Sequence, residues 1–147
     1  MLTGAFLLIL LGLAVIIPPL RNNKFYLLNI GLVVTASYFF ENNIFRIQNI
    51  VSYKTFLLFL IFHILSINIS TFIAYGVDKK AAQKNAWRIP EKDLHILEFL
   101  GGWPGAFFGQ KFFRHKTSKK SFQITYKLMI ILEFVIILGL LKYFGFI

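Results

Sequence analysis

Four long apolar stretches, separated by shorter polar ones, run along the chain at 2–20, 25–40, 55–75 and 122–147. A helix of about 20 apolar residues is long enough to cross the ~30 Å hydrocarbon layer of a membrane. Pro18-Pro19 closes the first stretch, and the polar segment 41–54 separates the second from the third. The pattern predicts an all-α integral membrane protein with about four transmembrane helices.

A fifth apolar stretch, 94–110, lies between the third and fourth predicted spans and differs from them. It is short, and Gly101-Gly102-Trp103-Pro104-Gly105 interrupts it with residues that disfavour helix interiors. This run lacks the Lys-Ser/Thr ending of a nucleotide-binding loop, so we interpret it as the bend of a hairpin. Ile89-Pro90-Glu91 predicts the start of the helix leading into that bend. The residues predicted to shape the hairpin are Pro90, Gly101, Gly102, Trp103, Pro104 and Gly105.

The composition agrees with a membrane protein, because hydrophobic residues make up 57% of the chain and charged residues only 15%. Soluble domains typically have about 45–50% and about 25% of these classes. A chain of 147 residues cannot bury that apolar surplus in its own core, so lipid is the expected solvent. The absence of cysteine excludes disulfides, Cys-ligated zinc, iron–sulfur clusters and thiol nucleophiles. The sequence identifies no cofactor.

The positive charge, a net +10, is concentrated on both sides of the fifth stretch. One basic block lies within 78–92 and the other within 111–120. Membrane proteins keep such blocks on the cytoplasmic side, and a crossing at 93–110 would place one of them outside. We therefore predict that this segment is a re-entrant or interfacial hairpin. Both basic blocks are then cytoplasmic, and both termini lie outside.

Two regions follow from this pattern. Residues 1–54 form an N-terminal extension with two predicted spans. Residues 55–147 form a core that contains the third span, the cytoplasmic basic helices and hairpin at 76–121, and the final span. Within the core, the alanine-containing segment 78–88 is expected to form a short interfacial helix of its own.

An ordered series of motifs runs through the core: YGVDK from Tyr75, WRIPE from Trp87, LH at Leu94, GGWPG from Gly101, Gln110 and RHKTSKKSF from Arg114. This series resembles the family known as domain of unknown function 1294, which consists of small bacterial membrane proteins. The resemblance implies a location in the bacterial cytoplasmic membrane and brings no biochemical activity with it. Some members of that family carry a cold-shock domain in front, where this chain has two apolar stretches. A nucleic-acid role therefore does not carry over, and the lipid bilayer is the expected partner.

The second basic block leads to our first functional hypothesis, a site for an anionic lipid headgroup or a phosphate-bearing partner at the cytoplasmic leaflet. Arginine gives bidentate hydrogen bonds to phosphate, and lysine contributes a compact positive charge. The alternative is that these charges only orient the chain and attract anionic lipid, at about 1 kcal/mol each. The predicted anion-binding residues are Arg88, Arg114, His115, Lys116 and Lys119.

A second hypothesis is a membrane enzyme that acts on a lipid or isoprenoid phosphate. Glu91, His95 and Glu98 recur at i, i+4 and i+7, which places them on one face of a helix. Carboxylates and an imidazole there can bind a divalent metal or act as acid and base. The catalytic candidates are Glu91, His95 and His115. The competing interpretation is that the acids form ion pairs with the neighbouring cations.

A third hypothesis rests on two ionisable residues inside predicted spans, His63 and Glu133. Each would lie about 16–18 Å from the cytoplasmic end of its helix, at 1.5 Å per residue. Ionisable residues at such depth are candidates for function, here in a proton-linked transporter or channel. Four spans in one subunit make a poor pore, so this hypothesis requires a homo-oligomer. The alternative is a hydrogen-bonded pair that joins two helices.

Overall fold

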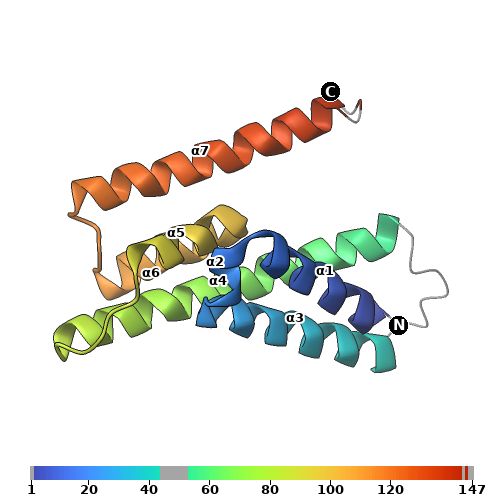
Figure 1. Cartoon of the computed structure of the whole chain (residues 1–147), viewed down its shortest axis with the longest axis horizontal. Helices are drawn as coiled ribbons and strands as arrows, with labels where there is room; N and C mark the ends of the chain where they lie inside the picture. Colours follow the sequence, from blue (N-terminus) through green and yellow to red (C-terminus); the bar gives the residue numbers. More distant parts are fainter. Residues whose placement is uncertain (1, 44–52, 144, 146–147) are drawn as a thin grey trace. The chain divides into compact units, whose positions relative to one another are not determined.

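The computed structural model describes residues 2–43, 53–143 and 145, and all regular structure within them is helical. The predicted all-α class is thus confirmed for the described part of the chain. The elements are α1 (Leu2–Ile16), α2 (Pro18–Arg21), α3 (Lys24–Asn43), α4 (Tyr53–Gln83), α5 (Glu91–Leu97), the π-helical turn η1 (Glu98–Gly102), α6 (Trp103–Phe113) and α7 (Lys120–Tyr143) (Figure 1). They form two compact units, Met1–Ser70 and Thr71–Ile147, which we call unit 1 and unit 2 and describe separately.

Unit 1 is built on a pair of antiparallel helices, α1 and α3. The side chain of Asn23 accepts hydrogen bonds from the backbone N–H groups of Phe25 (3.0 Å) and Tyr26 (3.3 Å), which caps the start of α3. The Tyr26 hydroxyl donates to the Leu10 carbonyl oxygen at 2.9 Å. At the other end, the Glu41 carboxylate accepts from the Thr3 hydroxyl at 2.8 Å. These bonds fix the register of the two helices at both ends.

Unit 2 is organised by a helical hairpin made of α5, η1 and α6. Leu100 (φ −84°, ψ 16°) and Gly101 (φ 95°, ψ 4°) leave helical geometry, so the chain turns back on itself there. A positive φ is readily adopted only by glycine, which explains the residue at that position. Gly109 lets α6 approach α4 closely, because a Cβ at this position would lie 2.9 Å from Cβ of Tyr75. The hairpin therefore packs against the C-terminal part of α4.

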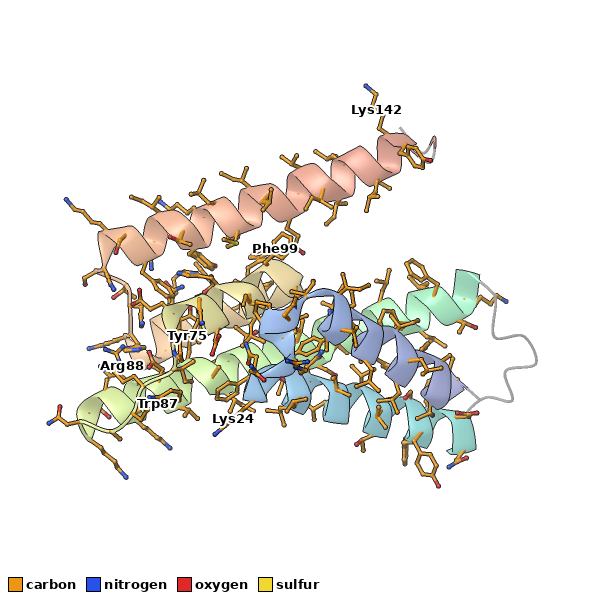
Figure 2. All side chains as sticks on the ribbon, in the orientation of Figure 1. Lys24, Tyr75, Trp87, Arg88, Phe99 and Lys142 are labelled. Carbon is orange, nitrogen blue, oxygen red and sulfur yellow. The ribbon has the colours of Figure 1, made fainter. Side chains whose placement is uncertain are left out.

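The predicted separate helix at 78–88 is wrong. Asp78–Gln83 is helical, but as the last turns of α4, which runs without a break from Tyr53 to Gln83. Ala81 and Ala82 have high helix propensity, and the segment contains neither glycine nor proline to end the helix. The helix stops at Gln83, and Asn85 adopts a left-handed conformation (φ 50°). Trp87 and Arg88 then lie on the linker to α5 (Figure 2).

Two helices of the described chain are long and apolar enough to cross a membrane, Lys54–Gln83 and Lys120–Tyr143, whereas the sequence pattern predicted about four. The first predicted span is divided, because α1 has only 15 residues and α2 is a separate helix of four. A helix of 15 residues is about 22 Å long, short of the ~30 Å hydrocarbon layer. In α3 the polar residues Asn29, Thr35, Ser37 and Glu41 lower the hydropathy of an otherwise apolar helix.

Candidate functional site

The buried carboxylate of Asp78 joins both ends of the hairpin to α4. Asp78 has no exposed surface. It accepts hydrogen bonds from the Ile89 backbone N–H (3.2 Å) at the start of the hairpin and from His115 Nε2 (2.7 Å) at its end. The Arg88 guanidinium donates to both carboxylate oxygens, at 3.1 and 3.3 Å. Lys116 Nζ lies 3.5 Å from Oδ2. One acid thus brings the two basic blocks of the sequence together.

Glu91, at the first position of α5, pairs with the other end of the hairpin. Its Oε1 accepts from Lys116 Nζ at 2.7 Å and from Lys119 Nζ at 2.8 Å. These two lysines lower the pKa of the Glu91 carboxyl from its usual 4.5 to about 2. The carboxylate is 36% exposed, so water screens part of this interaction.

A second buried carboxylate, Glu98, lies deeper in the hairpin and is also without exposed surface. It accepts hydrogen bonds from the Tyr75 hydroxyl and, at 2.6 Å, from His95 Nδ1. Gln110 Nε2 donates to the Tyr75 hydroxyl oxygen at 3.3 Å, and Gln123 Nε2 donates to Gln110 Oε1 at 2.5 Å. Side chains from α4, η1, α6 and α7 thus share one polar network. Buried polar groups of this kind stabilise one arrangement when all of them are satisfied.

The three predicted catalytic candidates do not form one group. Glu91 and His115 belong to the same ion-pair cluster, because Lys116 contacts both Glu91 and Asp78 and His115 bonds to Asp78. His95 bonds to Glu98 instead. The described residues contain no group of three or more His, Asp or Glu side chains that could hold a metal ion. The arrangement resembles the competing interpretation, in which acids pair with neighbouring basic groups.

Four of the five predicted anion-binding residues are engaged with acids of the chain. Arg88 and His115 donate to Asp78, and Lys116 and Lys119 donate to Glu91. The fifth, Arg114, is exposed at the end of α6 in a left-handed conformation (φ 47°). Its charge is therefore the one of the five that is most open to an external anion.

Arg114 belongs to a larger set of cations at one end of unit 2. In the part of the chain that the structure describes, none of them has a carboxylate within salt-bridge distance. They lie where α4 and α6 end and where α5 and α7 begin. We call this set the basic surface: Lys79, Lys80, Lys84, Lys92, Lys111, Arg114 and Lys120.

The two intramembrane candidates lie in different units. In unit 1, Nδ1 of His63 lies 3.4 Å from Nδ2 of Asn29, and the imidazole ring stacks on the ring of Phe59. Glu133, in unit 2, has a buried Oε2 with no hydrogen-bond partner among the described residues. Their pairing stays a prediction.

Sequence reasoning placed Glu98 on one helix face with Glu91 and His95 but assigned no individual role to the other residues that organise the network. Asp78, Tyr75 and Gln110 stood within the recognised motifs, but only as residues that carry the resemblance. The presence of these polar residues in a mainly apolar chain was the signal from which the sequence could have indicated a structural role for them. What they bond to depends on the hairpin fold, which brings Gln110 and Glu98 to the same tyrosine.

Comparison with known proteins agrees with the resemblance. Residues 68–122 match the family described as Protein of unknown function (DUF1294). The chain is also 35% identical over 75 residues to Uncharacterized protein YsdA of Bacillus subtilis (strain 168), a match that covers 51% of this chain and 84% of the relative. The chain belongs to the DUF1294 family. No solved structure matches it significantly. The DUF1294 match contains the whole hairpin and both buried carboxylates, Asp78 and Glu98.

Proposed function

We propose that this DUF1294 protein is a multi-pass membrane protein that binds the phosphate headgroups of anionic lipids through its basic surface. The observation that carries the proposal is the gathering of seven cations at one end of unit 2, none with a described carboxylate within salt-bridge distance. Each cation near a membrane surface attracts anionic lipid by about 1 kcal/mol. Trp87 lies on the adjoining linker and is 80% exposed, which suits an aromatic residue at the headgroup level (Figure 2).

The helices on either side of the basic surface support a membrane location. α7 has 24 residues and a length of about 36 Å, enough to cross the hydrocarbon layer. Its described residues include only two buried ones, Phe122 and Tyr126, while large apolar side chains such as Leu128 and Val135 are exposed. A soluble protein rarely exposes so continuous an apolar surface. α4 is long enough to be the second crossing helix.

In this arrangement the hairpin enters the membrane and returns. α5 with η1 has 12 residues and α6 has 11, so the two arms reach about 18 and about 16 Å. Neither arm can cross ~30 Å of hydrocarbon. Each arm has one end close to the Asp78 carboxylate, through Ile89 for the first arm and His115 for the second. The bend at Gly101 joins the other ends of the two arms. A re-entrant hairpin about half a bilayer deep fits this distribution of charge.

Orientation follows from the positive-inside rule, which places the basic surface in the cytoplasm. The far ends of α4 and α7, Tyr53 and Tyr143, are then outside. The hydrogen bond from Thr3 to Glu41 keeps the start of α1 next to the end of α3. The end of α3 is connected to Tyr53, at the start of α4, by the short segment 44–52, so both are assigned to the same side of the membrane. The N-terminal end therefore lies outside as well.

Lipid binding can be tested by native mass spectrometry of the full chain in detergent, titrated with phosphatidylglycerol or phosphatidylcholine. The test variant is Lys84→Gln/Arg114→Gln, and the matched control Lys24→Gln/Lys142→Gln removes the same charge elsewhere (Lys142 is at the far end of α7, Figure 2). At about 1 kcal/mol per cation, the test variant should bind phosphatidylglycerol at least tenfold more weakly. Equal loss in both variants, or no preference of the wild type for phosphatidylglycerol, would overturn the proposal.

Sidedness can be tested with single cysteines, because the chain has none of its own. Lys84→Cys and Ser118→Cys should both be shielded from a membrane-impermeant thiol reagent in intact cells, and Asn43→Cys should react. Reaction of positions 84 and 118 on opposite sides would show that 93–110 crosses the membrane.

A further inference from the structure

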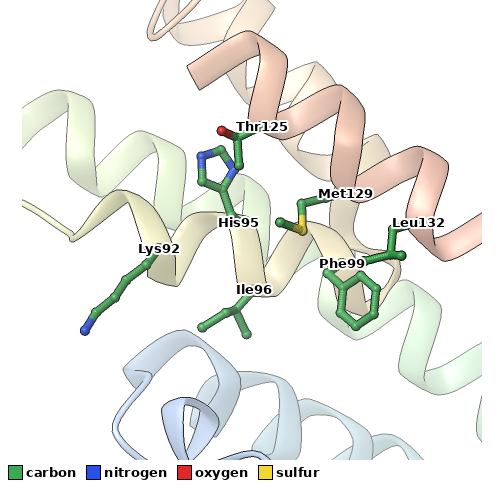
Figure 3. Close-up of a pocket in the computed structure, with 7 residues that line it drawn as sticks. All are labelled: Lys92, His95, Ile96, Phe99, Thr125, Met129 and Leu132. Carbon is green, nitrogen blue, oxygen red and sulfur yellow. The ribbon is translucent and has the colours of Figure 1, made fainter. Parts of the chain in front are cut away.

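Unit 2 contains a groove whose lining includes one member of the basic surface, Lys92, and one of the polar network, His95. The groove has a volume of about 330 Å³ and lies between α7 on one side and α5 with η1 on the other (Figure 3). This volume is at the lower end of the range found for ligand sites, about 300–1,000 Å³. Its lining residues are Lys92, His95, Ile96, Phe99, Thr125, Met129 and Leu132.

The character of the groove changes along its length. Lys92, His95 and Thr125 come from the first turns of α5 and α7, near the basic surface. Phe99 and Leu132 come about two turns later on the same two walls, and they are wholly apolar. The surface of the groove is almost wholly apolar, and Lys92 adds a cation at the end nearest the basic surface. This polarity matches an amphiphile whose headgroup remains near the membrane surface.

His95 is held in a fixed position on one wall of the groove. Glu98 accepts a hydrogen bond from Nδ1 of His95, and the Phe122 ring packs against the imidazole with centroids 4.3 Å apart. No hydrogen bond to Nε2 of His95 is found in the described part of the chain. The bond from Nδ1 to Glu98 therefore fixes the orientation of the ring that lines the groove. Lys92, one turn earlier on α5, is exposed and has no carboxylate within salt-bridge distance among the described residues, and its charge interacts at longer range with that of Asp93.

We propose that this groove binds one hydrocarbon chain of an anionic amphiphile, with its acidic headgroup at Lys92 and its chain along Phe99, Met129 and Leu132. The inference goes beyond the basic surface. The basic surface concerns headgroups that remain in the bilayer, whereas the groove takes up an individual chain. Either proposal can fail while the other holds.

The test uses the full chain in nanodiscs of neutral phosphatidylcholine and a palmitic acid analogue with a photoreactive diazirine in mid-chain. After illumination, mass spectrometry identifies the labelled residues. We expect labelling to concentrate on Phe99, Met129 and Leu132. Labelling spread evenly over exposed residues of α7, such as Leu128 and Val135, would mean contact with ordinary bilayer lipid and would overturn the proposal. This readout requires no variant to fold.

Two matched pairs of variants sharpen the result. Met129→Trp fills the groove and should lower the yield of labelled groove residues at least tenfold, whereas Leu128→Trp, on an exposed position of the same helix, should not. Lys92→Gln should lower labelling by the acid severalfold and leave labelling by the corresponding methyl ester unchanged. Lys142→Gln, at the far end of α7, serves as its control. Equal effects within either pair would contradict the assignment of the groove. That outcome would leave the proposal for the basic surface standing, because it is tested separately by the preference of the wild type for phosphatidylglycerol over phosphatidylcholine.

Discussion

The two units of this chain use polar side chains in different ways. In unit 1, Asn23, Tyr26 and Thr35 bond to backbone groups of their own or the adjoining helix. Its long-range side-chain pairs, Thr3–Glu41 and Asn29–His63, are only partly buried. In unit 2, the carboxylates of Asp78 and Glu98 are buried, and they bond to side chains that are far away in the sequence or on other elements. Local bonds stabilise individual helices and their register. A buried charged network stabilises one tertiary arrangement, because any other would leave a charge unpaired in a medium of low dielectric constant.

The glycines show the same difference. A Cβ added at Gly12 or Gly31 in unit 1 would meet nothing within 4 Å. In unit 2, a Cβ at Gly102 would meet the Thr71 hydroxyl and would lie 2.5 Å from the Leu97 carbonyl oxygen. Unit 2 is therefore the part of the molecule in which backbones approach most closely, and it contains the segment that matches the family.

The largest expected effect is the loss of Asp78. Asp78→Ala removes the buried acid that pairs with Arg88, His115 and Lys116. Removal of one member of a buried charged pair costs about 3–5 kcal/mol of the free energy of unfolding. Glu41→Ala, which removes the main carboxylate contact to α1 in unit 1, should cost about 1 kcal/mol. The free energies of unfolding of both variants, measured in mixed micelles with increasing SDS, give the comparison. Equal losses would show that Asp78 has no special role in the hairpin.

A smaller effect is expected from crowding at the hairpin. Gly102→Ala should destabilise the protein by about 1–3 kcal/mol, because Leu97 contributes a backbone atom that cannot move aside easily. Gly12→Ala is the matched substitution in unit 1 and should be neutral or slightly stabilising, since alanine has the higher helix propensity. Thermal unfolding in detergent distinguishes the two. A Gly102→Ala variant as stable as the wild type would mean that η1 lies less close to the Leu97 carbonyl and to Thr71 of α4 than described.

The smallest effect concerns the partly exposed ion pairs of Glu91. The folded protein holds the pKa of this carboxyl at about 2, below its usual 4.5. Its contribution to stability is therefore complete above about pH 4.5 and is lost as the pH falls through about 2. Because solvent screens the pair, Glu91→Gln should cost only about 1 kcal/mol at neutral pH.

The pH dependence provides the measurement for Glu91. The difference in unfolding free energy between wild type and Glu91→Gln should shrink as the pH is lowered from 7 to near 2. Lys84→Gln, which changes a cation of the basic surface, should show no such trend. A Glu91→Gln difference that stays constant over this range would mean that the lysines do not interact with the carboxylate.

The sequence by itself determined the helical class, the family and the start of α5 at Glu91. These features depend on local properties: apolar periodicity, helix-terminating residues and an ordered series of motifs. The sequence pattern overestimated the number of long apolar helices, because Pro18 divides the first stretch and polar residues lower the hydropathy of α3. It also placed a separate helix at 78–88, where the helical propensity of the alanines extends α4 instead.

The pairing of charges was decided by the tertiary structure alone. From the sequence, Arg88, His115, Lys116 and Lys119 looked like one anion site, and Glu91, His95 and His115 like one catalytic group. The turn at Gly101 returns the chain to α4, so that Asp78 and Glu91 bind four of these cationic groups and Glu98 holds His95. Hydrogen bonds form over about 3 Å. At that scale, the partner of each charge depends on how α4, α5 and α6 pack, which the spacing of residues along the chain does not specify.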